Sequence, residues 1–243
     1  MVWYILLIIV LLSLDFNVIQ ITSDQNILTA IVCIDRDAHL STKVYKALQR
    51  NNVNDILIVT RESDNKTIAF WDNKATVITV PHYDIEKRHN YSNLVKKRSI
   101  VLQHCIDKNY DGVWFVDSDI IPLDGTLDAL KRTYVDICFA PYIPSWDTCA
   151  CVGIETKEDP GFKIKYINIL DKIVARKTCC IGGFGCTFIK KSAFSQKIEY
   201  KCLTSNSKLV YGEDIGFFVN CKNAGLRAEY LTRWIQPHHL KKL

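Results

Sequence analysis

Residues 112–122 read Gly-Val-Trp-Phe-Val-Asp-Ser-Asp-Ile-Ile-Pro, an apolar run that carries two carboxylates one residue apart. The run has the composition of a buried strand, with Asp117 and Asp119 at its carboxyl end. Residues i and i+2 of a strand project to the same face, so both side chains can reach one divalent cation, which prefers oxygen ligands. The plainer interpretation is a strand that ends in a polar turn, with Pro122 as its stop.

The segments around this run predict an α/β domain. Strands are expected at residues 27–34, 55–60, 75–80, 114–121 and 135–140, and helices at residues 40–49, 91–108, 125–134 and 215–225. Because strand and helix alternate, the pattern favours a parallel sheet with helices on its faces. Asp117 and Asp119 then lie at the carboxyl edge of a central strand, where open α/β sheets bind ligands.

One long segment interrupts this alternation. Residues 141–163 are rich in proline and are expected to be irregular. Long loops inside a compact domain are usually functional, so an acceptor-binding loop is one interpretation. A surface excursion is the other.

Three further segments accompany the Asp-x-Asp pair: Ile-Gly-Gly-Phe-Gly-Cys-Thr-Phe-Ile at 181–189, Tyr-Gly-Glu-Asp-Ile-Gly-Phe-Phe at 211–218 and Pro-His-His at 237–239. In this order and at these separations, the four segments resemble the GT-A class of nucleotide-sugar-dependent glycosyltransferases, the DxD-motif family. The resemblance runs from about Ile27 to His239.

The resemblance implies a fold and an activity. The fold is α/β, a GT-A-like single domain over residues 23–243 with a Rossmann-like, mostly parallel mixed sheet flanked by helices. The activity is metal-dependent transfer of a sugar from a nucleotide-diphosphate sugar to a hydroxyl of a glycan, protein or lipid acceptor, with inversion. UDP-linked donors are the commonest partners of such sites.

The resemblance also implies a metal centre. Asp119 would ligate a Mn²⁺ or Mg²⁺ carried by the donor diphosphate, and Asp117 would contact the donor's ribose or sugar, or the metal. Many members complete the metal shell with a histidine near the C-terminus, a role that falls on His238 or His239. Adjacent residues of an extended segment face opposite ways, so at most one reaches the ion, and His238 is preferred. Imidazole favours Mn²⁺ over Mg²⁺. A solvated tail is the alternative.

Two acids open the expected C-terminal helix. Glu213 and Asp214 lie at its positive end, where capping and the helix dipole explain them without catalysis. The segment also resembles the Glu-Asp motif with which inverting GT-A enzymes deprotonate the acceptor hydroxyl. By that match Asp214 is the candidate general base, and Glu213 is an acceptor ligand or supporting acid.

Candidate donor contacts come from two places. Gly182 and Gly183 allow a ligand to approach the backbone closely, and in the family this stretch lies beneath the donor sugar, although turn formation alone would explain them. Lys97 and Arg98, on the helix before the Asp-x-Asp strand, are both candidates for contact with the donor diphosphate, and Arg98 is preferred because related proteins often carry a donor-contacting basic residue there. A charged, solvent-facing helix surface is otherwise expected for most of these residues.

Composition excludes some partners. The 243 residues carry a net charge of +5, and the basic residues are mostly scattered, whereas a nucleic-acid-binding surface would be more clustered. The mild excess is compatible with a small anionic substrate such as a sugar nucleotide, and equally with no functional meaning.

The N-terminus and two sequons suggest a compartment. Residues 2–14 form an apolar run too short for a comfortable membrane span, so residues 1–22 are expected to be a signal peptide or short signal anchor, with possible membrane association. Asn65-Lys66-Thr67 and Asn90-Tyr91-Ser92 are glycosylation sequons, consistent with the ER or Golgi lumen and a glycoprotein. A cytoplasmic location is the alternative. The ten cysteines fit lumenal disulfides or buried thiols.

Two other functions compete with glycosyl transfer. A phosphohydrolase of the haloacid dehalogenase type also has a strand that ends in Asp-x-Asp, but its motif normally lies near the start of the domain. A non-catalytic carbohydrate-binding relative would have a degenerate site, whereas acids stand at every expected place here.

Overall fold

The computed structural model describes residues 25–81, 91–142, 149–156, 163–168, 176–179, 181–201, 203–205, 208–231 and 238–239. The expected signal segment, residues 1–22, and the sequon asparagine Asn90 lie outside these residues. In the other sequon, Asn65 is exposed and Thr67 is buried. Within the described residues, no helix has the length and apolar character that a membrane span requires.

An eight-stranded sheet organises the described residues, in the order β3-β2-β1-β4-β11-β6-β14-β9. Its strands are β1 (Ile27–Val32), β2 (Asp55–Arg61), β3 (Thr76–Val80), β4 (Gly112–Val116), β6 (Ile137–Phe139), β9 (Arg176–Cys179), β11 (Cys186–Lys190) and β14 (Ala228–Leu231). β11 and β9 run antiparallel to their neighbours, and the other strands share one direction. The mostly parallel mixed sheet predicted from the sequence is confirmed.

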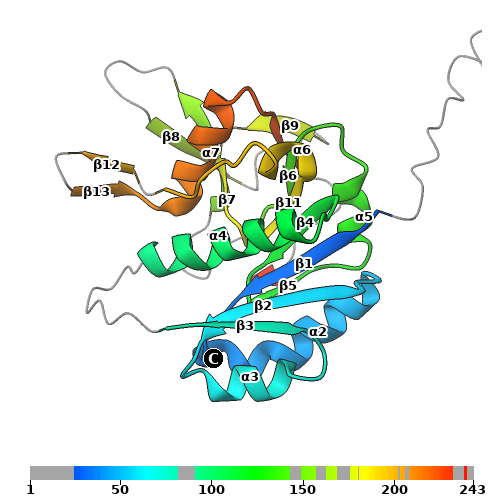
Figure 1. Ribbon diagram of the computed structural model, residues 1–243. Helices are drawn as coiled ribbons and strands as arrows, with labels where there is room; N and C mark the ends of the chain where they lie inside the picture. Colours follow the sequence, from blue (N-terminus) through cyan, green and yellow to red (C-terminus); the bar gives the residue numbers. More distant parts are fainter. Residues whose placement is uncertain are drawn as a thin grey trace, which may run out of the picture.

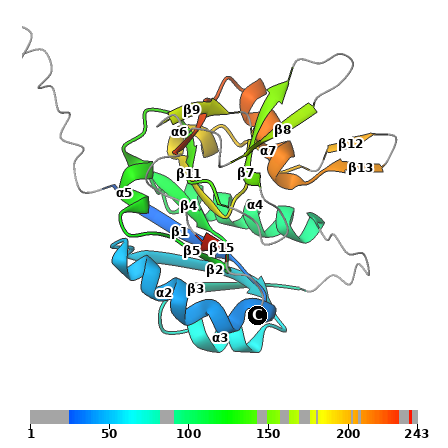
Figure 2. The ribbon, with the colours of Figure 1, turned by 180° about the vertical axis from the view of Figure 1, so that it is seen from behind.

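Helices cover both faces of this sheet (Figures 1 and 2). They are the 3-10 helix η1 (Asp35–Leu40), α2 (Ser41–Arg50), α3 (Asn65–Trp71), α4 (Tyr91–Asp107), α5 (Thr126–Lys131), α6 (Lys191–Phe194) and α7 (Glu213–Asn223). β4 shows why two layers form: Val113 and Phe115 pack into the cluster that holds α4 and α7, while Trp114 and Val116 pack into the one that holds α2, α3 and α5. A strand buried on both faces is continuously apolar, as the sequence indicated.

Smaller sheets extend this core. They are β10-β7-β8, with β7 (Cys149–Thr156), β8 (Lys163–Asn168) and β10 (Ile181–Gly182); β12 (Leu203–Ser205) with β13 (Lys208–Tyr211); and β5 (Ile120–Ile121) with β15 (His238–His239). The prediction that residues 141–163 are wholly irregular is wrong. β7 occupies residues 149–156 and pairs with β8 and β10, a long-range pairing that local composition does not reveal.

Three other boundaries differ from the sequence-based prediction. The expected strand 114–121 breaks after Val116, because the Ile120 amide donates to the Asp117 carbonyl at 3.1 Å and closes a turn. Helix α5 is shorter than residues 125–134 and begins after Gly125, whose φ of +76° is left-handed. Helix α3 was missed, since seven residues are too few to show a helical period.

Five cysteines among the described residues are buried in the core: Cys33, Cys105, Cys138, Cys186 and Cys221. Burial raises the pKa of Cys33, Cys105, Cys186 and Cys221 to about 12. Because the thiolate is the reactive form, these four side chains are chemically inert packing residues.

Candidate active site

The topology selects one place on the sheet. The chain fills β1, β2 and β3 outward in one direction and then returns to place β4 on the other side of β1. The carboxyl ends of β1 and β4 therefore lie next to each other at a topological switch point, where ligands of open α/β sheets bind.

Two acidic segments meet at this point. Asp37 lies in η1, directly after β1, and Asp117 and Asp119 follow β4. Ser118 joins the segments, because its hydroxyl donates to Asp37 Oδ2 at 3.0 Å. Sequence analysis missed Asp37; the available signal was an aspartate just beyond a buried strand.

The Asp-x-Asp pair is held in a turn rather than on a strand. The backbone amide of Asp117 donates to the Gly185 carbonyl at 3.0 Å, which ties this turn to the glycine-rich segment. Asp117 and Asp119 are both half-buried. The expectation that the two project from one strand face is thus corrected, while their place at the carboxyl edge is as predicted.

Arg98 connects the Asp-x-Asp turn to α7. Its side chain extends from α4, and its Nη1 donates to Glu213 Oε1. Its Nη2 lies 3.8 Å from Asp117 Oδ1, and the guanidinium carbon lies 4.5 Å from the centroid of the Phe184 ring. Residues from the Asp-x-Asp turn, α7 and the glycine-rich turn therefore converge on the guanidinium of Arg98.

Lys97, which was expected to face solvent, is buried instead, and so is Arg98, the preferred donor contact. Arg98 is 6% exposed and Lys97 is 3% exposed. Lys97 Nζ donates to the Cys33 carbonyl at 3.0 Å, beyond the end of β1, and burial lowers the pKa of Lys97. The positive charges of Lys97 and Arg98 are therefore both buried beside the carboxyl ends of β1 and β4.

Glu213 and Asp214 begin α7, as predicted. Glu213 is buried, whereas Asp214 is half-buried and its Oδ1 accepts the Ile215 amide at 2.8 Å. Burial raises the pKa of both carboxyls, and the charge of Arg98 opposes the shift. Glu213 Oε2 and Arg98 Nε are buried without a hydrogen-bond partner among the described residues.

The glycine-rich turn has a packing explanation. A Cβ on Gly182 would lie 2.6 Å from carbons of the Phe139 ring, and one on Gly185 would lie 2.6 Å from the Tyr142 ring. The Gly183 carbonyl accepts the Thr187 hydroxyl at 2.8 Å. Small residues therefore let this segment lie close against these rings.

The Pro-His-His segment reaches the same edge through its backbone. β15 pairs antiparallel with β5, and Figure 2 shows the two strands side by side. In this pair His238 is opposite Ile121 and His239 is opposite Ile120. Asp119 immediately precedes β5. The structure thus brings the segment of His238 next to the segment of Asp117 and Asp119, although more than a hundred residues separate them in the sequence.

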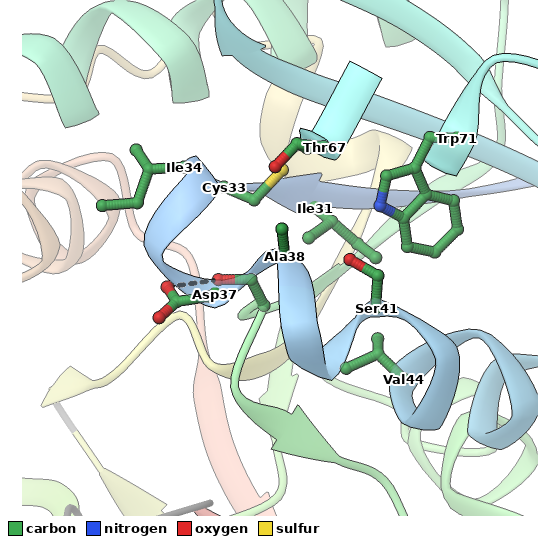
Figure 3. A pocket seen from close by; sticks show the side chains of 10 residues that line it. Ile31, Cys33, Ile34, Asp37, Ala38, Ser41, Val44, Thr67 and Trp71 are labelled. Carbon is green, nitrogen blue, oxygen red and sulfur yellow. Dashed lines mark hydrogen bonds between the residues drawn. The ribbon is translucent and has the colours of Figure 1, made fainter. Parts of the chain in front are cut away.

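A small cavity lies at the inner end of this edge. Figure 3 shows Asp37 at its rim and Trp71 at its far side, with Cys33 and Ser41 between them. Its volume of about 10 Å³ holds about one water molecule. It is therefore a crevice beside Asp37 and not a pocket of substrate size.

The donor set at the edge suits a hard divalent cation. Asp117 and Asp119 supply carboxylate oxygens, and Mg²⁺ and similar ions are commonly held by one or two carboxylates together with substrate phosphates. Among the described residues, no group of three or more His, Cys, Asp and Glu side chains forms a metal cluster. The chain's own residues thus fit a cation whose remaining ligands come from a substrate.

Comparison with known proteins supports the fold. The sequence matches no protein-family model and no curated protein. The structure is similar to A197 from STIV, with a TM-score of 0.52 and 16% identity over 90% of this chain and 87% of that chain. The chain thus has the α/β, GT-A-like fold that the sequence predicted, and an identity this low shows the fold alone.

Two further solved structures are similar at lower scores. 4-Diphosphocytidyl-2C-methyl-D-erythritol synthase has a TM-score of 0.48 and 7% identity, covering 87% of this chain and 90% of that chain. A nucleotidyl transferase from Methanothermobacter thermautotroptrophicus has a TM-score of 0.46 and 9% identity, covering 86% of this chain and 89% of that chain.

Proposed function

We propose that the protein is a metal-dependent glycosyltransferase that uses a nucleotide-diphosphate sugar. One observation carries the proposal: Arg98 is bound to Glu213 and lies 3.8 Å from Asp117, so the Asp-x-Asp turn and the Glu-Asp pair form one site at the switch point of the sheet. A transferase of this kind needs both groups, one for the leaving diphosphate and one for the attacking hydroxyl.

The Asp-x-Asp turn would hold the donor end. A bound Mn²⁺ or Mg²⁺ would neutralise the charge that builds on the departing diphosphate. Asp119 and Asp117 would hold it, with His238 as a further ligand, since β15 lies beside β5. Gly182 and Gly183 would line the floor beneath the donor sugar.

Asp214 would act on the acceptor. It is the more exposed of the two acids that begin α7, so it can reach a bound hydroxyl, and its raised pKa makes it a stronger base than an ordinary aspartate. Deprotonation of the hydroxyl as it attacks the anomeric carbon gives inversion in a single displacement. Glu213, held by Arg98, would support it.

The donor is expected to be UDP-linked and the acceptor to be a glycan, protein or lipid, with the ER or Golgi lumen as the proposed location. The decisive experiment incubates the full chain with a panel of sugar nucleotides and Mn²⁺, with and without a chelator and with and without glycan, protein or lipid acceptors, and measures free nucleoside diphosphate. We expect release that needs the metal and an acceptor.

Variants make this test specific. Asp119→Ala and Asp214→Asn should each lower turnover by about 10²-fold or more, because each removes a group that acts in the transition state. Asp124→Ala, an exposed acid at the other edge of the sheet, is the matched control. Retained turnover in Asp119→Ala would overturn the proposal.

Assays with other substrates separate the alternative functions. Release of inorganic phosphate from phosphate esters would indicate a phosphohydrolase. Sugar binding without any nucleotide release would indicate a non-catalytic relative. Pyrophosphate release from a nucleoside triphosphate and a sugar phosphate would indicate nucleotidyl transfer.

A further inference from the structure

The Arg98 guanidinium is fixed between the two halves of the candidate site. It donates to Glu213 from Nη1, lies over the Phe184 ring at 4.5 Å, and has a side chain that is 7% exposed. Swinging this group outward would break these contacts and leave the Glu213 carboxylate buried without its counter-charge, which is strongly unfavourable. Arg98 therefore stays in place when a ligand arrives.

Asp117 has a different environment on the other side of Arg98. The distance of 3.8 Å from Arg98 Nη2 to Asp117 Oδ1 is too long for a hydrogen bond but short enough for a strong charge interaction. The Asp117 side chain is 32% exposed, so an approaching cation can reach it. That cation would share Asp117 with a positive charge that cannot move away.

We propose that Arg98 is a fixed counter-ion of Asp117 that keeps the binding of a bare divalent cation weak, so that strong binding requires the diphosphate of the nucleotide. This rests on the proposed function, since it concerns the same metal centre. Like charges repel, and the negative phosphates of the nucleotide offset this repulsion. Metal and nucleotide would therefore strengthen each other's binding by the same factor.

The proposal gives the two acids of α7 separate roles. Glu213 is the more buried acid and is bonded to Arg98, so it is a positioning residue that anchors the guanidinium. Asp214 is half-exposed and bonded to a backbone amide, which leaves it for the acceptor.

The test removes the counter-ion without changing the net charge. The double variant Arg98→Met/Glu213→Leu loses one charge of each sign, and apolar replacement of a whole buried pair is often neutral or stabilising. The Kd of Mn²⁺ is measured by electron paramagnetic resonance in the absence of nucleotide and with saturating UDP, and in parallel with GDP. The matched control is Arg50→Met/Asp124→Leu, which removes an exposed pair at the other edge of the sheet.

We expect the double variant to bind Mn²⁺ alone about three- to tenfold more tightly than the wild type. The strengthening of Mn²⁺ binding by nucleotide should fall by a similar factor. The control should match the wild type in both measurements. If circular dichroism shows that the apolar variant does not fold, Arg98→Gln/Glu213→Gln replaces it, because two amides can keep a hydrogen bond across the pair.

Each other outcome is decisive. Unchanged or weaker binding of Mn²⁺ alone in the folded double variant overturns the counter-ion role, while the proposed function stands if the wild type still binds Mn²⁺ with nucleotide. If the wild type binds no Mn²⁺ with either nucleotide, both the counter-ion role and the proposed function fail.

Discussion

The two edges of the main sheet treat charge in opposite ways. At the carboxyl edge, Arg98 and Glu213 are buried together. At the amino edge, Arg50 Nε lies 2.6 Å from Asp124 Oδ1, and these side chains are 48% and 65% exposed. Removing charges from water costs several kcal/mol per ion, so a buried pair is a poor way to gain stability. The difference favours the carboxyl edge as the location of the candidate site.

Cavity volume alone would favour the amino edge as the ligand-binding site. A groove of about 430 Å³ lies at the amino edge, where Asn52, Asp128 and Lys131 are among its lining residues, whereas the cavity beside Asp37 measures about 10 Å³. The buried ion pair is nevertheless the stronger indicator of a functional site. Loops leave concave surface wherever they depart from a sheet, while a buried ion pair must be maintained against its desolvation cost.

Replacing Arg98 alone should show the largest difference in stability between the buried pair and the exposed pair. Arg98→Met leaves Glu213 buried without its counter-charge, and we expect a loss of about 3–5 kcal/mol in the free energy of unfolding. Arg50→Met, at the exposed pair, should cost less than about 1 kcal/mol. Urea denaturation at neutral pH measures both values.

The cause of this loss can be checked within the same pair. Adding Glu213→Gln to Arg98→Met removes the uncompensated charge, so most of the lost stability should return. If the double replacement is no more stable than Arg98→Met, the loss arises from packing against Phe184 instead.

A glycine of the carboxyl edge should show the next largest effect. Gly182→Ala places a Cβ 2.6 Å from the Phe139 ring, and overpacking of this kind costs about 1–3 kcal/mol. Combining it with Phe139→Leu should restore part of the stability, as measured by thermal unfolding. Equal stability of Gly182→Ala and the wild type would show that the turn yields easily, which would favour a ligand-binding role for this glycine.

Local sequence patterns predicted the elements that position the site. The strand expected at 27–34 is β1, Ile27–Val32, and the helix expected at 91–108 is α4, Tyr91–Asp107. The first is a continuous apolar run of strand length, the second is long enough to show a helical period, and the Glu-Asp pair marks the start of α7.

Local patterns could not predict which charges are buried. Arg98 and Glu213 are separated by 115 residues, and the packing of α7 beside α4 brings them together. The same limit explains why Lys97 was expected in solvent and why Asp37 was missed, since their partners at the ends of β1 and β4 are distant in sequence.

The buried acids should give the carboxyl edge a distinct pH dependence. Burial raises the pKa of Glu213 and Asp214 above their ordinary values of 4.5 and 3.8. Between the ordinary and the raised values, the folded chain binds more protons than the unfolded chain, so these groups make stability fall as pH rises. In Glu213→Gln the fall should be shallower, which melting temperatures between pH 4 and pH 7 would show. A slope equal to that of the wild type would mean that Arg98 cancels the effect of burial.

Ser118→Ala should have the smallest effect on stability of these variants, and it tests whether Asp37 belongs to the candidate site. The variant removes the hydroxyl that donates to Asp37 at 3.0 Å, and a hydrogen bond of this kind contributes about 1 kcal/mol. Asp37 keeps its contact with Arg36 Nε at 3.2 Å, so the carboxylate is not left without a partner. If the bond serves only stability, unfolding changes and nucleotide binding does not. If the bond instead aligns η1 with the Asp-x-Asp turn for a ligand, the Kd for UDP with Mn²⁺ should rise although the variant remains folded. The candidate site would then include η1, the segment that follows β1.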